Sequence, residues 1–202
     1  MLEKTLDRET AKKIMAIPGE ARGIHLKNDA EYILSHYNKK TLEKVEKELE
    51  SLGYPLKYKK VNNLGFYPAG LRVLSLLVIQ KTLNLNEEQI KELCAFATRA
   101  SFAIRLYLKF FYSIPKILEK ASQLWRDYWT FGKLEVKEHN EIKGEVKIEI
   151  KDFSLHPLYC RCLEGYFAGL AKMITKNKNI TCKEISCEFN NGKNHLFLIK
   201  YK

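Results

Sequence analysis

Long apolar runs are missing from this chain of 202 residues, in which hydrophobic residues make up 46%. No window approaches the roughly 18 uncharged apolar residues that a membrane-spanning helix needs. The opening residues, MLEKTLDRETAKK, carry charge where a signal peptide would have its apolar segment. We therefore expect a cytoplasmic protein without a membrane partner.

Linkers and repeats are missing as well. The sequence has no Pro/Ser-rich stretch, no low-complexity segment and no internal repeat. A chain of this length can bury one sufficient core without accessory staples. The sequence therefore predicts a single domain over 1–202, with a mainly helical part at 1–131 and a sheet with the last helix at 132–202.

The familiar enzyme motifs are also lacking. There is no G-x-S-x-G elbow, no P-loop and no G-x-G-x-x-G turn. Cys160 and His156 are a conceivable nucleophile and base, but they lie four residues apart across Pro157. A capping or metal-adjacent role for His156 is the stronger interpretation. We predict that the protein is not an enzyme.

The basic residues behind the net charge of +11 are scattered along the chain and not clustered. Stretches such as TLEKVEKELESLGY and GEVKIEIK mix lysine with glutamate, which is typical of solvated faces. This pattern disfavours a nucleic-acid partner. A basic nucleic-acid-binding protein stays an alternative, and it would present a contiguous basic face and a steep salt dependence.

Hydrophobic periodicity and cap residues predict helices first and strands afterwards. The expected elements are a helix opened by the capping pattern Asn28 to Glu31, a helix opened by Thr41 and stopped by Gly53, helices at 67–83 and from Asn86 to about Tyr112, a helix capped by Ser113 and Pro115, two strands after Gly132, a helix at 157–175 and a hairpin at 182–201. The fold class is α+β, with an N-terminal helical layer on a mainly antiparallel sheet and a β-β-α-β-β C-terminal half.

Five cysteines are an odd number for a chain that we place in the cytosol, which argues against a disulfide framework. Cys94 falls on the apolar stripe of its helix and is expected in the core. The other four, Cys160, Cys162, Cys182 and Cys187, lie in the last quarter of the chain. Their clustering indicates metal binding or redox chemistry, with chance as the plain alternative.

The final hairpin, CKEISCEFNNGKNHLFLIKY, has an Asn191-Gly192 pair that predicts a two-residue turn. That turn would place Cys187 and His195 near each other but on opposite faces of the hairpin. Glu184 and Cys187 are also separated by strand alternation, because their spacing is odd. We therefore predict a β-bulge near Ser186, which would bring these side chains to one side.

The last quarter of the chain contains the run from Cys160 through Gly165 and Tyr166 to Gly169, the strand from Glu184 to Cys187, Gly192, and a residue able to bind a metal at position 195. Together these features resemble the 4-vinyl-reductase-type small-molecule-binding domain. That domain shares a superfamily with haem-nitric-oxide sensor domains and TRAPP tethering subunits. The resemblance implies a structural zinc. Its ligands would be Cys160, Glu184, Cys187 and His195, with His195 where the family has cysteine, and with Cys162 and Cys182 as substitutes.

Three of these ligands have a plainer interpretation. Cys187 lies between apolar residues and could be a small buried hydrophobe. His195 could merely flank a turn, and Glu184 could be a solvated strand residue.

The same resemblance implies a sensor that binds an apolar or aromatic small molecule, forms a homodimer and signals through a separate partner. The lining residues expected for its pocket are Phe102, Tyr107, Trp125, Trp129 and Tyr166, although an ordinary core would use the same side chains. A structural dimeric protein of the tethering type is a further alternative.

Haem is disfavoured at the level of sequence. The chain lacks the Tyr-x-Ser-x-Arg signature of the haem branch, and His25, His36 and His139 offer no better axial ligand.

Overall fold

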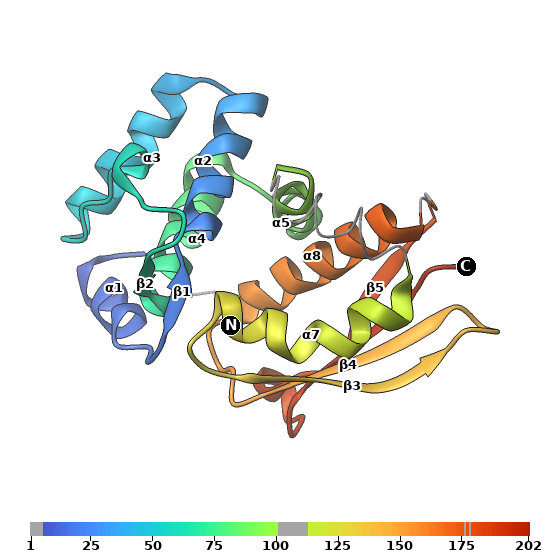
Figure 1. The fold of residues 1–202 in the computed structure, drawn as a ribbon. Helices are drawn as coiled ribbons and strands as arrows, with labels where there is room; N and C mark the ends of the chain where they lie inside the picture. The colour runs from blue at the N-terminus through green and yellow to red at the C-terminus, as the bar shows by residue number, and fades with distance from the viewer. Residues whose placement is uncertain (1–5, 101–112, 176, 178) are drawn as a thin grey trace. The chain divides into compact units, whose positions relative to one another are not determined.

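A computed structural model describes residues 6–100, 113–175, 177 and 179–202. The chain divides into two compact units, Met1–Gln89 and Ile90–Lys202, and each is considered by itself. The predicted α+β class is confirmed (Figure 1). The strands of the larger sheet begin at Lys133, at the predicted change after Gly132, whereas the two units divide earlier, after Gln89. In the described part of the chain, no helix is long and apolar enough to cross a membrane.

The first unit is built around α4, a helix with apolar residues on all sides. Its elements are α1 (Arg8–Met15), β1 (Glu20–Arg22), α2 (Ile24–His36), α3 (Lys39–Ser51), the short 3-10 helix η1 (Tyr58–Lys60), β2 (Phe66–Pro68) and α4 (Ala69–Leu83). Along α4, Val73, Leu74 and Leu76 are almost fully buried, as expected for a helix surrounded by others. Strands β1 and β2 form a two-stranded antiparallel ladder.

Two predicted helix starts are wrong. Helix α2 begins at Ile24, four residues before Asn28, and both Asn28 and Asp29 are buried within it. Helix α3 is capped by Asn38, whose side chain accepts a hydrogen bond from the Thr41 amide, so Thr41 lies inside the first turn.

Three other predicted helix boundaries are confirmed. Gly53 follows the end of α3 with a φ of 91°, a conformation that glycine adopts without strain. Asn86 and Gln89 form the reciprocal bonds of a capping box at the start of α5 (Glu87–Ala100). Ser113 occupies the N-cap position of α7 (Ile114–Tyr128), although its side chain makes no capping hydrogen bond. The predicted continuation of α5 to Tyr112 lies outside the described residues.

The second unit has the predicted β-β-α-β-β order after α7. Its remaining elements are β3 (Lys133–Asn140), β4 (Glu145–Lys151), α8 (Pro157–Thr175), β5 (Thr181–Ser186), the short 3-10 helix η2 (Glu188–Asn190) and β6 (His195–Lys200). The strands form an antiparallel sheet in the order β3-β4-β6-β5, with α7 and α8 against one face (Figure 1). Alternate strand residues are buried beneath these helices: Leu134, Val146, Ile148, Ile150, Phe197 and Ile199.

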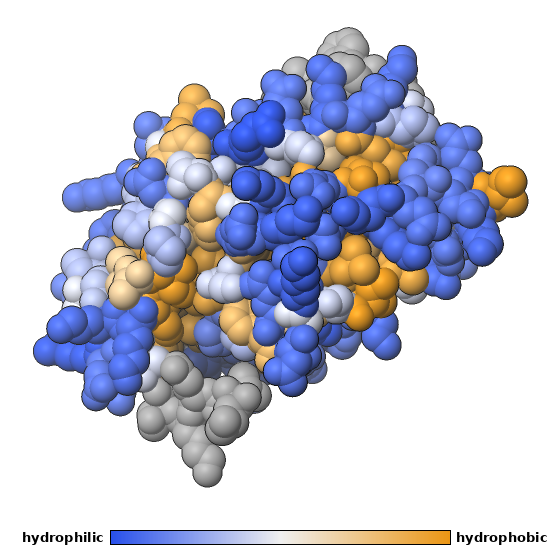
Figure 2. All heavy atoms as spheres, turned by 90° about the horizontal axis from the view of Figure 1, so that it is seen from below, coloured by the Kyte–Doolittle hydropathy of each residue, from blue (hydrophilic) through white to orange (hydrophobic). Residues whose placement is uncertain are grey.

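The opposite face of this sheet carries charged side chains in pairs. Lys151 contacts Glu135 at 2.8 Å, and Lys147 contacts Glu138 at 2.6 Å. In the space-filling view, hydrophilic side chains cover most of the visible surface, with hydrophobic patches between them (Figure 2). The lysines of this face are thus balanced by glutamates, as their alternation in the sequence indicated.

A buried ion pair in the first unit explains the position of Asp29. Its carboxylate lies 2.6 Å from the Arg72 guanidinium, and the two side chains are only 2% and 4% exposed. Burial raises the pKa of Asp29 to about 6, although Arg72 acts in the opposite direction. Nearby, the Tyr58 and Ser75 hydroxyls are hydrogen bonded at 2.7 Å. A charge enclosed in this way requires its partner.

We expect Arg72→Met to lower the free energy of unfolding by about 3–5 kcal/mol, because it leaves the buried Asp29 without its counter-ion. Urea denaturation followed by circular dichroism would measure the loss. Lys39→Met breaks the solvent-exposed pair of Lys39 with Glu43 and should have a far smaller effect. Equal losses in the two variants would contradict the structural role given to the buried pair.

Candidate metal centre

The predicted bulge in the final hairpin is confirmed. The pairing of β5 with β6 shifts register between Glu184 and Ser186. The predicted two-residue turn is wrong, because the strands are joined through residues 187–194, which include η2. In this loop the Cys187 carbonyl accepts hydrogen bonds from the amides of Asn190 and Gly192, at 3.0 and 2.8 Å. A Cβ at Gly192 would lie 2.7 Å from the Cys187 backbone, so only glycine fits.

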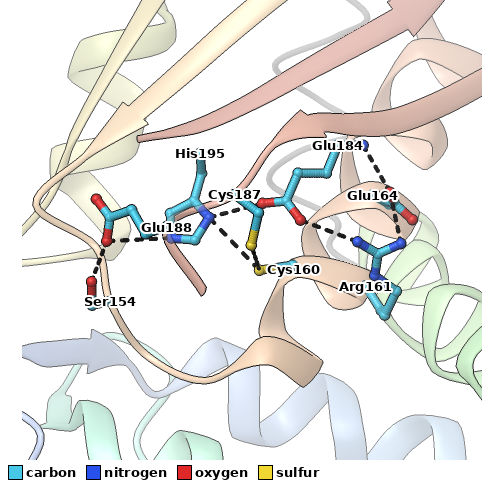
Figure 3. Close-up of polar contacts among 8 residues, drawn as sticks. All are labelled: Ser154, Cys160, Arg161, Glu164, Glu184, Cys187, Glu188 and His195. Atoms are coloured by element: carbon cyan, nitrogen blue, oxygen red, sulfur yellow. Dashed lines mark hydrogen bonds and ion pairs between the residues drawn. The ribbon is translucent and has the colours of Figure 1, made fainter. Parts of the chain in front are cut away.

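Together the bulge and the loop bring four predicted ligands to one point (Figure 3). Cys160 comes from the first turn of α8, Glu184 from β5, Cys187 from the residue after β5, and His195 from the first residue of β6. One potential ligand atom from each of the four lies within 4.8 Å of the other three. Cys160, Cys187 and His195 are buried, and the Glu184 side chain is 3% exposed.

The spacing of these atoms fits a tetrahedral metal ion. Zinc–sulfur bonds of about 2.3 Å place two thiolates about 3.8 Å apart at the corners of a tetrahedron. The Sγ atoms of Cys160 and Cys187 are 3.8 Å apart, and Cys160 Sγ is 3.7 Å from His195 Nδ1. His195 Nδ1 and Glu184 Oε1 are 2.8 Å apart, a hydrogen-bond distance. That edge would open by roughly half an ångström around a zinc ion.

Both thiols hold their protons firmly in the absence of a metal. Burial raises the pKa of Cys160, and the neighbouring Glu184 carboxylate raises it further. Burial also raises the pKa of Cys187. A metal that takes both sulfurs as thiolates must therefore displace two protons.

Further charged residues that the sequence analysis missed surround the cluster (Figure 3). Arg161 contacts Glu184 and Glu164, both at 3.1 Å, and Lys91 contacts Glu164 at 3.1 Å. On the other side, Glu188 Oε2 lies 3.7 Å from His195 Nε2 and accepts a hydrogen bond from the Ser154 hydroxyl. Only the three-residue spacing of Arg161 and Glu164 was a sequence signal for any of these contacts.

Cys162 is not available as a substitute ligand. It forms a disulfide with Cys94 of α5, so the expectation of a chain without disulfides is wrong. Cys94 is buried, as predicted, but it is not a free core thiol. Two residues along a helix turn the side chain by about 200°, which directs Cys160 and Cys162 to different neighbours. Cys182, the other proposed substitute, is a free, partly buried thiol outside the cluster.

Helices α5 and α8 come close enough to be joined because glycines lie where they cross. A Cβ on Gly165 would lie 2.0 Å from the Lys91 carbonyl oxygen. A Cβ on Gly169 would lie 2.8 Å from Thr98 Oγ1. The glycines that carried part of the family resemblance thus serve helix packing.

The tryptophans proposed to line a ligand pocket lie in an aromatic cluster. Trp125 and Trp129 are buried and stacked, with ring centroids 5.8 Å apart, and both contact Phe153 edge to face. The Trp125 indole N–H donates to the Phe131 carbonyl at 3.1 Å. Tyr166 is partly buried, and burial raises its pKa. Phe102 and Tyr107 lie outside the described residues.

His156 has the capping role that its position suggested. Its Nδ1 accepts a hydrogen bond from the Leu158 amide, 3.1 Å away, in the first turn of α8. This nitrogen therefore serves as a hydrogen-bond acceptor at the start of α8.

No protein-family model matches the chain, and no curated protein matches it in sequence. Solved structures do match in fold. An H-NOX protein from S. oneidensis, in the Fe(II)NO ligation state, aligns with a TM-score of 0.67 at 12% identity, covering 89% of this chain and 98% of that one. Unliganded Fe(II) H-NOX from K. algicida aligns with a TM-score of 0.60 at 13% identity, covering 89% and 95%.

These structures define the fold class: the chain has the fold of the H-NOX structures. They also correct the exclusion of haem, because the solved structures that share the fold are H-NOX proteins in Fe(II) and Fe(II)NO states. The absence of one sequence signature was not a sufficient reason for that exclusion.

Counting thiols would test the disulfide. Protein purified without reductant and unfolded with a chelator present should react with Ellman's reagent at three cysteines, Cys160, Cys182 and Cys187. Full reduction should raise the number to all five. In Cys162→Ser, Cys94 loses its partner, so the unreduced variant should show an additional reactive thiol although it has one cysteine fewer. Five reactive thiols in the unreduced wild type would contradict the disulfide.

Proposed function

We propose that this protein is a small-molecule sensor domain whose C-terminal unit holds a structural zinc ion. The ligands are Cys160, Glu184, Cys187 and His195. The observation that carries the metal site is the convergence of four donor atoms, from α8 and both strands of the hairpin, within 4.8 Å. The ion would fix the final hairpin to the start of α8.

The donor set favours zinc among the common metals. Two thiolates and an imidazole are ligands typical of Zn²⁺, which also accepts a carboxylate and prefers four ligands in a tetrahedron. Four protein ligands leave no position for water or a substrate. The proposed role is therefore structural.

The haem carried by the related fold would need a different site. The four donor atoms of this cluster lie within 4.8 Å of one another, so they would enclose an ion and leave no space for a macrocycle between them. The cluster therefore suits a single bare ion, and it is not a haem site. When bound elsewhere in the fold, haem would supply the iron at which a diatomic gas can bind.

The sensor role is supported by the fold. At a TM-score of 0.67, the match extends over 89% of the chain. We propose that the sensed molecule is an apolar or aromatic ligand, or a diatomic gas bound at a haem. Trp125 and Trp129 would lie near the sensed molecule. We further propose that the protein acts as a homodimer and passes its signal to a separate partner.

Native mass spectrometry of the purified chain tests the sensor role, together with haemin titration followed at the Soret band. A retained small molecule or stoichiometric haem uptake would support it. A chain that retains no molecule and takes up no haem would contradict it.

For the metal site we predict one zinc per chain by elemental analysis. Cys187→Ala and His195→Ala should each lower zinc affinity at least 100-fold, because each removes a ligand. His195→Cys should retain zinc, since thiolate is an equally competent ligand. Circular dichroism of each variant would establish that it is folded.

Cys162→Ser and Cys182→Ser are the matched controls for this experiment. Both remove a cysteine from α8 or β5 without touching the four ligands, so their zinc content should equal that of the wild type. Loss of zinc from Cys182→Ser, or full zinc content in Cys187→Ala, would contradict the assignment.

Zinc affinity should rise steeply with pH. The pKa values of Cys160 and Cys187 are both raised in the metal-free protein, so below them two protons leave for each zinc bound. The apparent association constant should then increase by about 100-fold per pH unit between pH 6 and 7. Titration calorimetry in buffers of different ionisation enthalpy would count the protons. Cys187→Ser should halve the logarithmic slope, whereas an affinity independent of pH would contradict thiolate ligation.

A further inference from the structure

Glu184 is held to α8 by both its backbone and its side chain. Its amide donates to Glu164 Oε1 at 2.8 Å, and its Oε2 accepts from Arg161 at 3.1 Å. Only Oε1 is left toward the cluster, where it lies 2.8 Å from His195 Nδ1. The carboxylate is therefore oriented to offer a single oxygen to a metal.

From this arrangement we infer that Arg161 is a positioning residue of the metal centre, which presents Glu184 as a one-oxygen ligand and neutralises the charge of the occupied site. The inference rests on the zinc site proposed above. Arg161 does not contact the ion. It follows Cys160 directly in α8, so one turn of helix supplies both a ligand and the group that orients another ligand.

Charge balance gives the second reason. Two thiolates and one carboxylate around a divalent cation leave one negative charge in a region shielded from water. An unpaired buried charge is costly, and the Arg161 guanidinium can supply its partner. Arg161 also contacts Glu164, but that buried carboxylate has a counter-ion of its own in Lys91, at 3.1 Å. The positive charge of Arg161 is thus available to the metal site.

The geometry requires arginine and not only a positive charge. One terminal nitrogen of the guanidinium contacts Glu164, and the other contacts Glu184 (Figure 3). A planar fork can bridge two carboxylates in this way, whereas a lysine ammonium acts as a single point charge. Loss of a group that orients a metal ligand without touching the ion typically lowers metal affinity by 10-fold to 100-fold.

The test measures zinc affinity by competition with a chromophoric chelator at fixed pH. Arg161→Gln should bind zinc about 10-fold to 100-fold more weakly than wild type, because it removes the charge and loosens Glu184. Arg161→Lys keeps the charge but loses the bridge, and it should bind about threefold to tenfold more weakly. Arg126→Gln changes an exposed arginine at the end of α7 and should leave the affinity unchanged.

The visible spectrum of the cobalt-substituted protein reports on the ligands of the metal. It would not change if Arg161 only stabilised the fold. If Arg161 positions Glu184, the visible ligand-field bands of Co²⁺ should shift in Arg161→Gln, because the carboxylate changes its coordination. The disulfide and the circular dichroism spectrum should stay as in wild type. If the glutamine variant fails to fold, Arg161→Lys provides the same two measurements.

The outcomes separate the two proposals. Wild-type affinity and an unchanged cobalt spectrum in both Arg161 variants would overturn the role of Arg161 and leave the zinc site standing. Failure of the wild-type chain to bind zinc would overturn the metal centre itself, and this inference with it.

Discussion

The attachment of the last hairpin to the first turns of α8 is the constraint on which the second unit depends. Among the strands that the structure describes, β5 lies at the edge of the sheet beside β6, and β6 begins at His195. The residues meeting there are two thiols, an imidazole and a carboxylate, all shielded from solvent. Polar groups buried in this way stabilise a fold only when they satisfy each other. Without a metal the contacts are hydrogen bonds, and a metal would replace them with stronger bonds from the same atoms.

Helix α8 can serve this attachment because its other side is fixed as well. Cys162 is bonded to Cys94 of α5, and Gly165 permits near contact with the Lys91 backbone. The side chains of Cys160 and Arg161 project instead to the hairpin. A helix held by covalent and steric contacts can keep ligand positions constant, which a tetrahedral site requires. The glycines and the disulfide therefore fix α8 against α5, while the four candidate ligands lie at its other contact, with the hairpin.

Much of this unit could be predicted from local sequence. Periodicity and caps placed α8 and the strands, and the odd spacing of Glu184 and Cys187 required the bulge that the structure shows. Contacts between distant segments could not be predicted. Nothing local connects Cys94 with Cys162, which are 68 residues apart, or Lys91 with Glu164. The start of α2 was missed for the same reason, because the run from Asn28 to Glu31 has the form of a capping box, while Asp29 is held inside the helix by Arg72 of another helix.

The wrong prediction on haem shows that a missing sequence motif excludes only one way of binding a cofactor. A signature such as Tyr-x-Ser-x-Arg reports one way of gripping a cofactor, whereas a fold depends on the burial pattern, which survives at 12% identity. The cluster of Cys160, Glu184, Cys187 and His195 has a proposed role separate from haem. All four of its donors belong to the second unit, and a closed four-ligand site offers no position for a sensed molecule. The proposed sensing role would therefore use other residues, and the proposed zinc would maintain the hairpin whether or not a sensed ligand is bound.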